Sequence, residues 1–214
     1  MLLERERELL VAYGQKLISH RLTTGTGGNL SIFNREKGLL AITPTGLDYF
    51  DTRPEDIIVL KVDGEIVEGK QEPSSELPMH RIFYQQRKDI NALVHVHSRH
   101  ATTLSCLNWD LPAVHYLVAF AGNEVKCAQY ATFGSEELAR SAFEAMKDRK
   151  AVLLANHGLL TGGKDLPFAF DLAEVIEFCA EIYYRSKCIG EPVIISARKM
   201  EAVAEKLKLY ASLE

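Results

Sequence analysis

Ala92-Leu93-Val94-His95-Val96-His97 is the stretch that decides the fold of this chain. Its apolar and β-branched side chains predict a strand buried inside a sheet. Because side chains alternate between the two faces of a strand, His95 and His97 project from the same face, one pleat apart. Two neutral imidazoles in that arrangement can bind one divalent metal ion. The stretch therefore predicts a buried strand and part of a metal site together.

A third candidate ligand, His157, follows a second buried run, Ala151-Val152-Leu153-Leu154-Ala155. A carboxylate candidate, Glu76, ends the stretch Pro73-Ser74-Ser75-Glu76. An H-x-H pair alone is a weak signal, because histidines on apolar strands are often hydrogen-bonded within the core. Three histidines with an open or exchangeable fourth position nevertheless form the ligand set of a catalytic metal site rather than a structural one.

The bulk composition sets limits on the class of protein. The 214 residues suit one domain, which we take to span residues 1–214, and 47% apolar residues suffice for a core without disulfides. A net charge of −4 gives no reason to expect nucleic acid or an anionic membrane as a partner. Cys106, Cys127, Cys179 and Cys188 are widely spaced, and the N-terminus lacks the apolar region of a signal peptide. We therefore expect a cytoplasmic protein with reduced thiols.

The pattern along the chain predicts an α/β fold with three layers, α/β/α. The hairpin signal Asp63-Gly64 favours a central mixed, mostly antiparallel sheet over a doubly wound parallel one. Ser74 or Ser75 is expected to cap the second helix, and Ser135 a later one. Strands are expected at about 29–34, 38–43, 57–62, 65–67, 92–97, 151–155 and 158–161. Helices are expected at about 3–21, 76–87, 99–106, 166–189 and 197–212, with a further one after Ser135.

Three short segments can bind an anion. The glycine-rich run Gly25-Thr26-Gly27-Gly28-Asn29 can bring backbone N–H groups close to a phosphate, although no Lys-Ser/Thr follows as in a P-loop. Thr45-Gly46 offers a hydroxyl and an unobstructed amide. Ser74-Ser75 offers two hydroxyls near a helix N-terminus, where the helix dipole favours negative charge. Each segment alone is commonplace, and only their joint presence beside the histidines points to a phosphorylated ligand.

The motifs resemble those of the class II (metal-dependent) aldolase and adducin-head family, and most of all its fuculose-phosphate aldolase branch. The resemblance runs nearly end to end. It is carried by Gly25–Ser31, Ile42–Gly46, Pro73–Glu76, Val94–His97 and Asn156–Leu159, with Pro112–Tyr116 and Tyr130–Gly134 in similar form.

The resemblance implies a set of site residues. By it, His95, His97 and His157 bind one divalent metal ion, zinc in the first place with manganese or cobalt as alternatives. Glu76 is the acid/base that can also take the metal's fourth position. The implied phosphate site consists of Gly28, Asn29, Thr45, Gly46, Ser74 and Ser75. Tyr116 is expected to act from a neighbouring subunit of a homotetramer, and Phe133 and Tyr210 to enclose the aldehyde end.

The implied activity is a lyase reaction of carbohydrate metabolism. The substrate is a sugar phosphate, a deoxyketose 1-phosphate of the L-fuculose or 5-deoxyribulose type, and the products are dihydroxyacetone phosphate and a small aldehyde. A methylthioribulose-1-phosphate dehydratase is an alternative, and so is a pentulose-phosphate epimerase, although epimerases carry aspartate where this chain has Glu76. A non-catalytic adducin-like module is disfavoured, because such modules lose the metal histidines. The sequence leaves open which aldehyde is released.

The remaining histidines and one apolar segment receive weaker interpretations. His20 and His80 are interpreted as structural. His100, at the start of the helix after the metal strand, either supports the metal ligands or is a partly exposed polar residue. His115 adjoins Tyr116 and is a candidate for a subunit contact. The run Trp109–Gly122 is more apolar than an ordinary connection and belongs either to the core or to an interface. The family resemblance favours the interface.

Overall fold

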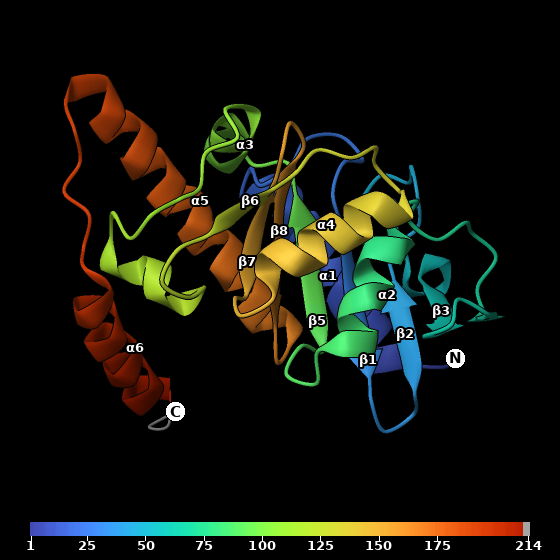
Figure 1. The fold of residues 1–214 in the computed structure, drawn as a ribbon. Coiled ribbons are helices and arrows are strands. Elements are labelled where there is room, and N and C mark those ends of the chain that lie inside the picture. The colour runs from blue at the N-terminus through green and yellow to red at the C-terminus, as the bar shows by residue number, and fades with distance from the viewer. Residues whose placement is uncertain (212–214) are drawn as a thin grey trace.

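The computed structural model describes the backbone of residues 1–211 and the side chains of residues 1–207 (Figure 1). The strands are β1 (Asn29–Asn34), β2 (Leu39–Ile42), β3 (Ile58–Lys61), β4 (Ile66–Glu68), β5 (Ala92–Val96), β6 (Lys126–Ala128), β7 (Ala151–Leu154) and β8 (Gly158–Gly163). The helices are α1 (Glu4–Ser19), α2 (Leu77–Gln86), α3 (Arg99–Cys106), α4 (Glu136–Met146), α5 (Leu166–Ile189) and α6 (Ala197–Ala211), with 3-10 helices η1 (Pro54–Asp56) and η2 (Tyr116–Phe120).

The strands form one sheet in the order β4-β3-β2-β1-β5-β8-β7-β6. All neighbouring strands run antiparallel except β6 and β7, which are parallel. Helices α2 and α4 cover one face, and α1, α3 and α5 cover the other (Figure 1). The expected three-layer α/β/α fold with a mixed, mostly antiparallel sheet is confirmed.

Strand β5 is an inner strand of the sheet, and its side chains pack on both faces. Val94 and Val96 point into the apolar cluster under α1, α3 and α5. Leu93 points to the opposite face, into the cluster under α2 and α4. Because His95 lies two residues after Leu93, it projects toward the α2 side. The alternation that buries this strand thereby places a histidine between the sheet and the start of α2.

One local expectation is wrong, and one strand was not predicted. Helix α2 begins at Leu77 with Glu76 in the N-cap position, so Ser74 and Ser75 lie before the cap rather than in it. Pro78 in the first turn favours this helix start. Its ring fixes φ near the helical value, and proline has no N–H group that would need an acceptor. Strand β6 was not expected, because Lys126–Ala128 has neither polar–apolar alternation nor β-branched side chains.

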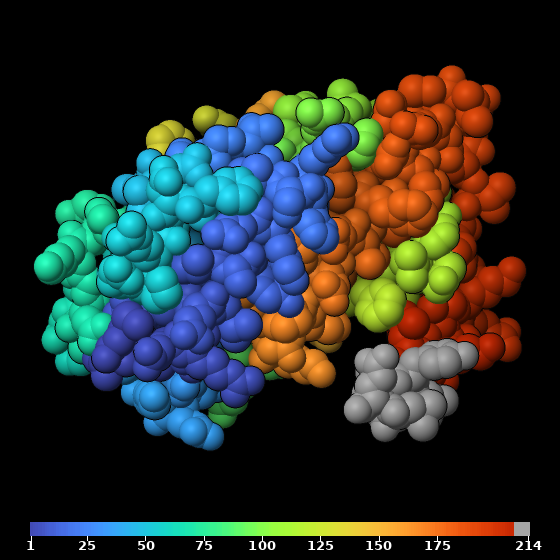
Figure 2. Space-filling view, turned by 180° about the vertical axis from the view of Figure 1, so that it is seen from behind, coloured from blue at the N-terminus to red at the C-terminus, as the bar shows by residue number. Residues whose placement is uncertain are grey.

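The apolar segment Trp109–Gly122 divides between core and surface. Val118 is fully buried, whereas Tyr116 in the same 3-10 helix is 48% exposed. Helix η2 packs against α5 and α6, and Figure 2 shows this yellow-green stretch between the orange and red helices. Further exposed apolar side chains of this end of the molecule are Leu107, Trp109, Phe178, Ile189, Val193 and Ile194. Over the described residues, no helix combines the length and the apolar content needed to cross a membrane.

Arg7 of α1 is buried, with 1% of its surface exposed. Its guanidinium donates hydrogen bonds to the carbonyl oxygens of Leu2, Pro54 and Ile57. It also contacts the Glu68 carboxylate at 2.7 Å. One side chain therefore ties α1 to the segment that enters β3 and to the edge strand β4.

We predict that Arg7→Met lowers the free energy of unfolding by about 3 kcal/mol, because buried carbonyl groups lose their donors while the apolar stem is kept. Urea denaturation of the purified variant measures the loss. Lys61→Met is the matched control, because Lys61 forms an exposed pair with Glu65 and its replacement should leave stability nearly unchanged. Equal losses in the two variants would contradict the structural role given to Arg7.

Candidate active site

The three candidate metal histidines meet because β5 pairs with β8. The two strands run antiparallel with Val96 opposite Leu159, so the end of β5 lies beside the turn that leads into β8. His157 stands in that turn, and His97 stands just beyond the end of β5. The ring centroids of His95, His97 and His157 lie 4.7–5.1 Å apart.

Two residues shape the turn that carries His157. Asn156 has a left-handed backbone with φ of 53°, a conformation that asparagine tolerates better than most residues. Gly158 lies directly against the carbonyl of Val96, where a Cβ atom would have no room. The close approach allows the turn to lie against the end of β5, and it keeps His157 beside His97.

One nitrogen of each ring faces a common point. His95 Nε2 lies 3.0 Å from His97 Nε2, and the three candidate ligand nitrogens all lie within 4.8 Å of one another. Nitrogen ligands of a tetrahedral zinc site, at about 2.0 Å from the metal, are about 3.3 Å apart. His95 Nδ1 lies 3.0 Å from the carbonyl oxygen of Leu159, which only accepts. That bond holds the proton of the neutral ring on Nδ1 and leaves the Nε2 lone pair for a metal.

Glu76 completes the cluster from the N-cap of α2. Its Oε2 lies 3.0 Å from His95 Nε2, and its Oε1 lies 3.5 Å from His157 Nε2. Asn29 Nδ2 donates to Oε2 at 3.0 Å, whereas the buried Oε1 has no hydrogen-bond donor. A buried carboxylate oxygen without a donor requires a compensating charge. Three imidazole nitrogens and this oxygen fit a divalent cation.

The pKa shifts of the cluster agree with a metal-binding role. Burial acts to raise the pKa of Glu76, but His95, His157 and Asn29 together hold it far below its ordinary range. Burial, reinforced by the neighbouring imidazoles, lowers the pKa of His97 to about 3 and that of His157 to about 4. Burial also disfavours charge on His95, yet Glu76 raises its pKa. At neutral pH the site therefore offers the neutral imidazoles of His97 and His157 beside an ionised carboxylate.

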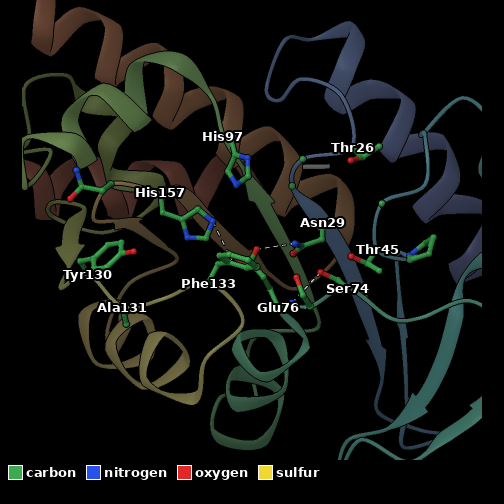
Figure 3. Close-up of a pocket in the computed structure, with 16 residues that line it drawn as sticks. Thr26, Asn29, Thr45, Ser74, Glu76, His97, Tyr130, Ala131, Phe133 and His157 are labelled. Carbon is green, nitrogen blue, oxygen red and sulfur yellow. Dashed lines mark hydrogen bonds and ion pairs between the residues drawn. The ribbon is translucent and has the colours of Figure 1, made fainter.

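A pocket of about 360 Å³ opens above these residues. Figure 3 shows His97, His157 and Glu76 pointing toward one another across it. His95 is fully buried beneath them. The other lining residues are Thr26, Gly27, Gly28, Asn29, Pro44, Thr45, Gly46, Ser74, Ser75, Tyr130, Ala131, Phe133 and Asn156. The pocket therefore has a polar floor of metal-binding side chains and a rim made by several loops.

All six residues expected to bind phosphate line this pocket: Gly28, Asn29, Thr45, Gly46, Ser74 and Ser75. Two of the three loops are joined by backbone bonds, because the N–H of Ser74 donates to the Thr43 carbonyl and the N–H of Thr45 donates to the Glu72 carbonyl. Gly28 has φ of 74°, and a Cβ there would lie 2.7 Å from the His95 carbonyl oxygen. The described residues of the lining include no lysine or arginine, so amide and hydroxyl donors would have to hold an anion.

The residues expected at the aldehyde end are placed differently from one another. Phe133 lines the pocket and is 67% exposed. Tyr116 does not line the pocket of its own chain. Tyr210 lies in α6, and its side chain is outside the described residues. Tyr130 also lines the pocket and is 63% exposed. It was not predicted as a site residue, although the stretch Tyr130–Gly134 carries part of the family resemblance.

Sequence reasoning also gave His80 a structural role only. Its ring is fully buried and lies 2.6 Å from Asn29, which in turn contacts Glu76. The four-residue spacing of Glu76, His80 and Tyr84 places all three on one side of α2, and that spacing was the available signal. His100 and Glu177 meet at the start of α3, where the N–H of His100 donates to the Glu177 carboxylate.

The chain resembles known proteins of one family over most of its length. Residues 8–184 match the family described as Class II Aldolase and Adducin N-terminal domain. The chain is 59% identical to a 5-deoxy-D-ribulose 1-phosphate aldolase of Bacillus thuringiensis serovar kurstaki, over 98% of this chain and 99% of the relative. It is 43% identical to a 5-methylthioribulose-1-phosphate/5-deoxyribulose-1-phosphate aldolase of Rhodospirillum rubrum, over 95% of this chain and 91% of the relative. The solved structure of an L-fuculose 1-phosphate aldolase superposes on this chain with a TM-score of 0.94 at 51% identity. The superposition covers 95% of this chain and 96% of that structure.

We predict that alanine at His95, His97 or His157 removes the bound metal, because each replacement deletes one of three convergent ligands. Elemental analysis of the purified protein should fall from about one metal ion per chain to near zero. His20→Ala is the control, because that ring lies on the surface beside Glu174. A full equivalent of metal in the triple variant would refute the assignment.

Proposed function

The chain belongs to the class II aldolase and adducin family, and on this basis we propose that it cleaves a deoxyketose 1-phosphate reversibly to dihydroxyacetone phosphate and a small aldehyde. The observation that carries the proposal is the cluster of three histidines and Glu76 at the floor of a pocket rimmed by anion-binding loops. The relatives named for 5-deoxyribulose and 5-methylthioribulose 1-phosphate share this chemistry, because both sugars carry a 1-phosphate and no oxygen on C5.

The residues of the site divide the work of breaking the C3–C4 bond. His95, His97 and His157 would hold a divalent metal, which would supply Lewis-acid stabilisation for the negative charge that develops as the bond breaks. Cleavage moves one proton, in net, from the C4 hydroxyl to C3. Glu76 reaches the pocket from the N-cap of α2 and is the group that holds and delivers the proton at C3. The lowered pKa of Glu76 keeps this carboxylate ionised beside His95.

The rim of the pocket orients the substrate from its phosphate end. The loops that contain Gly28, Thr45 and Ser74 present backbone N–H groups and hydroxyls, which suit phosphate oxygens. Asn29 uses one amide hydrogen for Glu76 and keeps the other for a ligand. Phe133 and Tyr130 at the mouth offer apolar surface for the methyl-bearing aldehyde end. Binding energy gained at the phosphate helps to position the reacting carbons at the floor.

Zinc is the metal that we assign to the site, because three imidazoles and a carboxylate form a four-ligand set that suits it, with manganese and cobalt as alternatives. We place the protein in the cytoplasm. The four cysteines are free thiols, which suits a reducing compartment.

We further propose that the enzyme works as a homotetramer with shared active sites. Tyr116 is exposed and does not line the pocket of its own chain, so it is available to a neighbouring copy. Its hydroxyl would there exchange the proton of the C4 oxygen. Tyr210 is assigned to the same aldehyde end. The exposed apolar side chains around η2 and α5 supply the contact surface.

The reaction is tested with a panel of ketose 1-phosphates, in which released dihydroxyacetone phosphate is measured with a coupled dehydrogenase. We expect turnover of the 5-deoxyribulose and L-fuculose 1-phosphates. The matching free sugars should have kcat/KM lower by ~100-fold or more, because three loops serve the phosphate. Equal cleavage of a free sugar and its 1-phosphate would refute the loop assignment. Sugar-phosphate consumption without dihydroxyacetone phosphate would replace the aldolase by a dehydratase or an epimerase.

The shared site is tested by mixing two inactive variants, Tyr116→Phe and His95→Ala. After subunit exchange, about a quarter of the sites in an equal mixture would join an intact metal site to an intact tyrosine. We therefore expect activity to return to at most that fraction of wild type. Each variant exchanged with itself is the control. No recovery despite proven exchange, or a fully active monomer, would rule the shared site out.

A further inference from the structure

A chain of buried polar side chains leads from the core to Glu76. Tyr84, Ser31, His80 and Asn29 follow one another with short contacts. Ser31 Oγ lies 2.6 Å from Tyr84 OH and 2.6 Å from His80 Nδ1. His80 Nε2 lies 2.6 Å from Asn29 Oδ1, and Asn29 Nδ2 lies 3.0 Å from Glu76 Oε2. All five residues are buried, with at most 5% of their surface exposed.

The fold produces this chain from two periodicities. Glu76, His80 and Tyr84 are spaced by four residues along the start and body of α2, so they share one side of the helix. Asn29 and Ser31 are two residues apart on β1 and point to the same face of the sheet. That face is the one that α2 covers. The polar chain therefore fills the space between β1 and α2 next to the metal-binding histidines.

The donor directions in the chain follow from Glu76. An ionised carboxylate only accepts, so Asn29 must turn its Nδ2 toward Glu76 and its Oδ1 toward His80. An amide oxygen also only accepts, so His80 must donate from Nε2. The neutral ring then accepts at Nδ1, which makes Ser31 the donor to His80. Because the single hydroxyl proton of Ser31 is thereby used, Ser31 Oγ accepts from Tyr84 at 2.6 Å, and the Tyr84 hydroxyl also donates to the Ser31 carbonyl oxygen at 3.1 Å. Each side-chain bond between Tyr84 and Glu76 then points toward the carboxylate.

The charge state of His80 agrees with this order. Burial lowers the pKa of His80 to about 3, so the ring is neutral at physiological pH and has one acceptor and one donor nitrogen. Burial also raises the pKa of Tyr84 well above its ordinary value, so its hydroxyl keeps its proton. Aligned hydrogen bonds in a low-dielectric interior polarise one another, so each bond of the chain strengthens its neighbours.

We propose that His80 is a positioning residue for catalysis, which through Asn29 fixes Glu76 by its Oε2 and leaves Oε1 aimed into the site. The inference rests on the proposed aldolase function. Oε1 has no hydrogen-bond donor, whereas Oε2 receives Asn29 and lies beside His95. A carboxylate held by one oxygen cannot rotate freely, and its other oxygen stays ready for a metal or a proton. The His80 ring acts on the reaction only through this placement.

The tautomer of His80 gives the first test, and it needs no substrate. Long-range ¹⁵N–¹H spectra of the wild-type protein at neutral pH should show a neutral ring with its proton on Nε2. A proton on Nδ1 would reverse the donor order and overturn the proposal. Because this measurement is made without turnover, it stands apart from the proposed function, which fails if wild type cleaves no ketose 1-phosphate.

The second test separates positioning from stability. His80→Phe should lower kcat by about 10- to 100-fold with KM and metal content nearly unchanged, as expected for loss of an outer support of a ligand. His80→Gln can donate to Asn29 from its amide nitrogen and should recover most of kcat. The matched control is Thr161→Val, because Thr161 is as fully buried as His80. Its hydroxyl donates to the carbonyl oxygens of Val94 and Ala169 rather than to Glu76. That variant should lose thermal stability but keep kcat.

The outcomes that contradict the proposal are distinct. If kcat of His80→Phe stays within about threefold of wild type, the chain does not position Glu76. The same holds if His80→Gln is as slow as His80→Phe, or if kcat falls in step with the unfolding temperature in Thr161→Val as well. Should His80→Phe fail to fold, Ser31→Ala takes its place. This variant should shift part of the His80 population to the other tautomer and should lower kcat. A shifted tautomer with unchanged kcat would overturn the proposal.

Discussion

The pairing of β5 with β8 is the constraint on which the rest of the structure depends. It joins the two halves of the sheet, because β1 to β4 lie on one side of this pair and β6 and β7 on the other. The same register sets Val96 opposite Leu159 and brings the β7–β8 turn to the end of β5. A one-residue slip would turn His95 to the other face and move His157 away from it. The apolar core therefore enforces the geometry of the metal site.

The face of the sheet under α2 changes character along its length. Leu93 and Phe33 belong to an apolar cluster, while His95, Asn29 and Ser31, further along the same strands and faces, belong to a polar one. Burying so many polar groups costs stability unless each finds a partner. His95, Asn29 and Ser31 each have a partner, whereas Glu76 Oε1, which faces the histidines, has no hydrogen-bond donor. That pattern is expected where a site rather than the fold has determined the residue types.

The sequence predicted the parts of the site that follow from strand alternation and short motifs. His95 and His97 were placed by the period of a strand, and the loops by their glycine and serine runs. Other parts depend on packing that no local pattern contains. Strand β6 is held by its parallel neighbour β7 rather than by its own residues, and Ser74 lost the cap position because Pro78 sets the start of α2. The contacts of His80 could not be predicted, because its partners, Asn29 and Ser31, come from a strand some fifty residues earlier.

The pocket in a single chain is a half-enclosed site. Its floor is well ordered by buried contacts, but its mouth is formed by Tyr130 and Phe133, which are mostly exposed. Breaking a carbon–carbon bond through a carbanion-like state requires that water be kept from the reacting carbon. Tyr116 is also exposed, but it is not among the described residues that line the pocket. A neighbouring copy that covered the mouth would bury both apolar surfaces at once. The need to exclude water from the reaction and the need to bury exposed apolar area would then be met by the same contact, which is the physical reason to expect catalysis and assembly to be coupled.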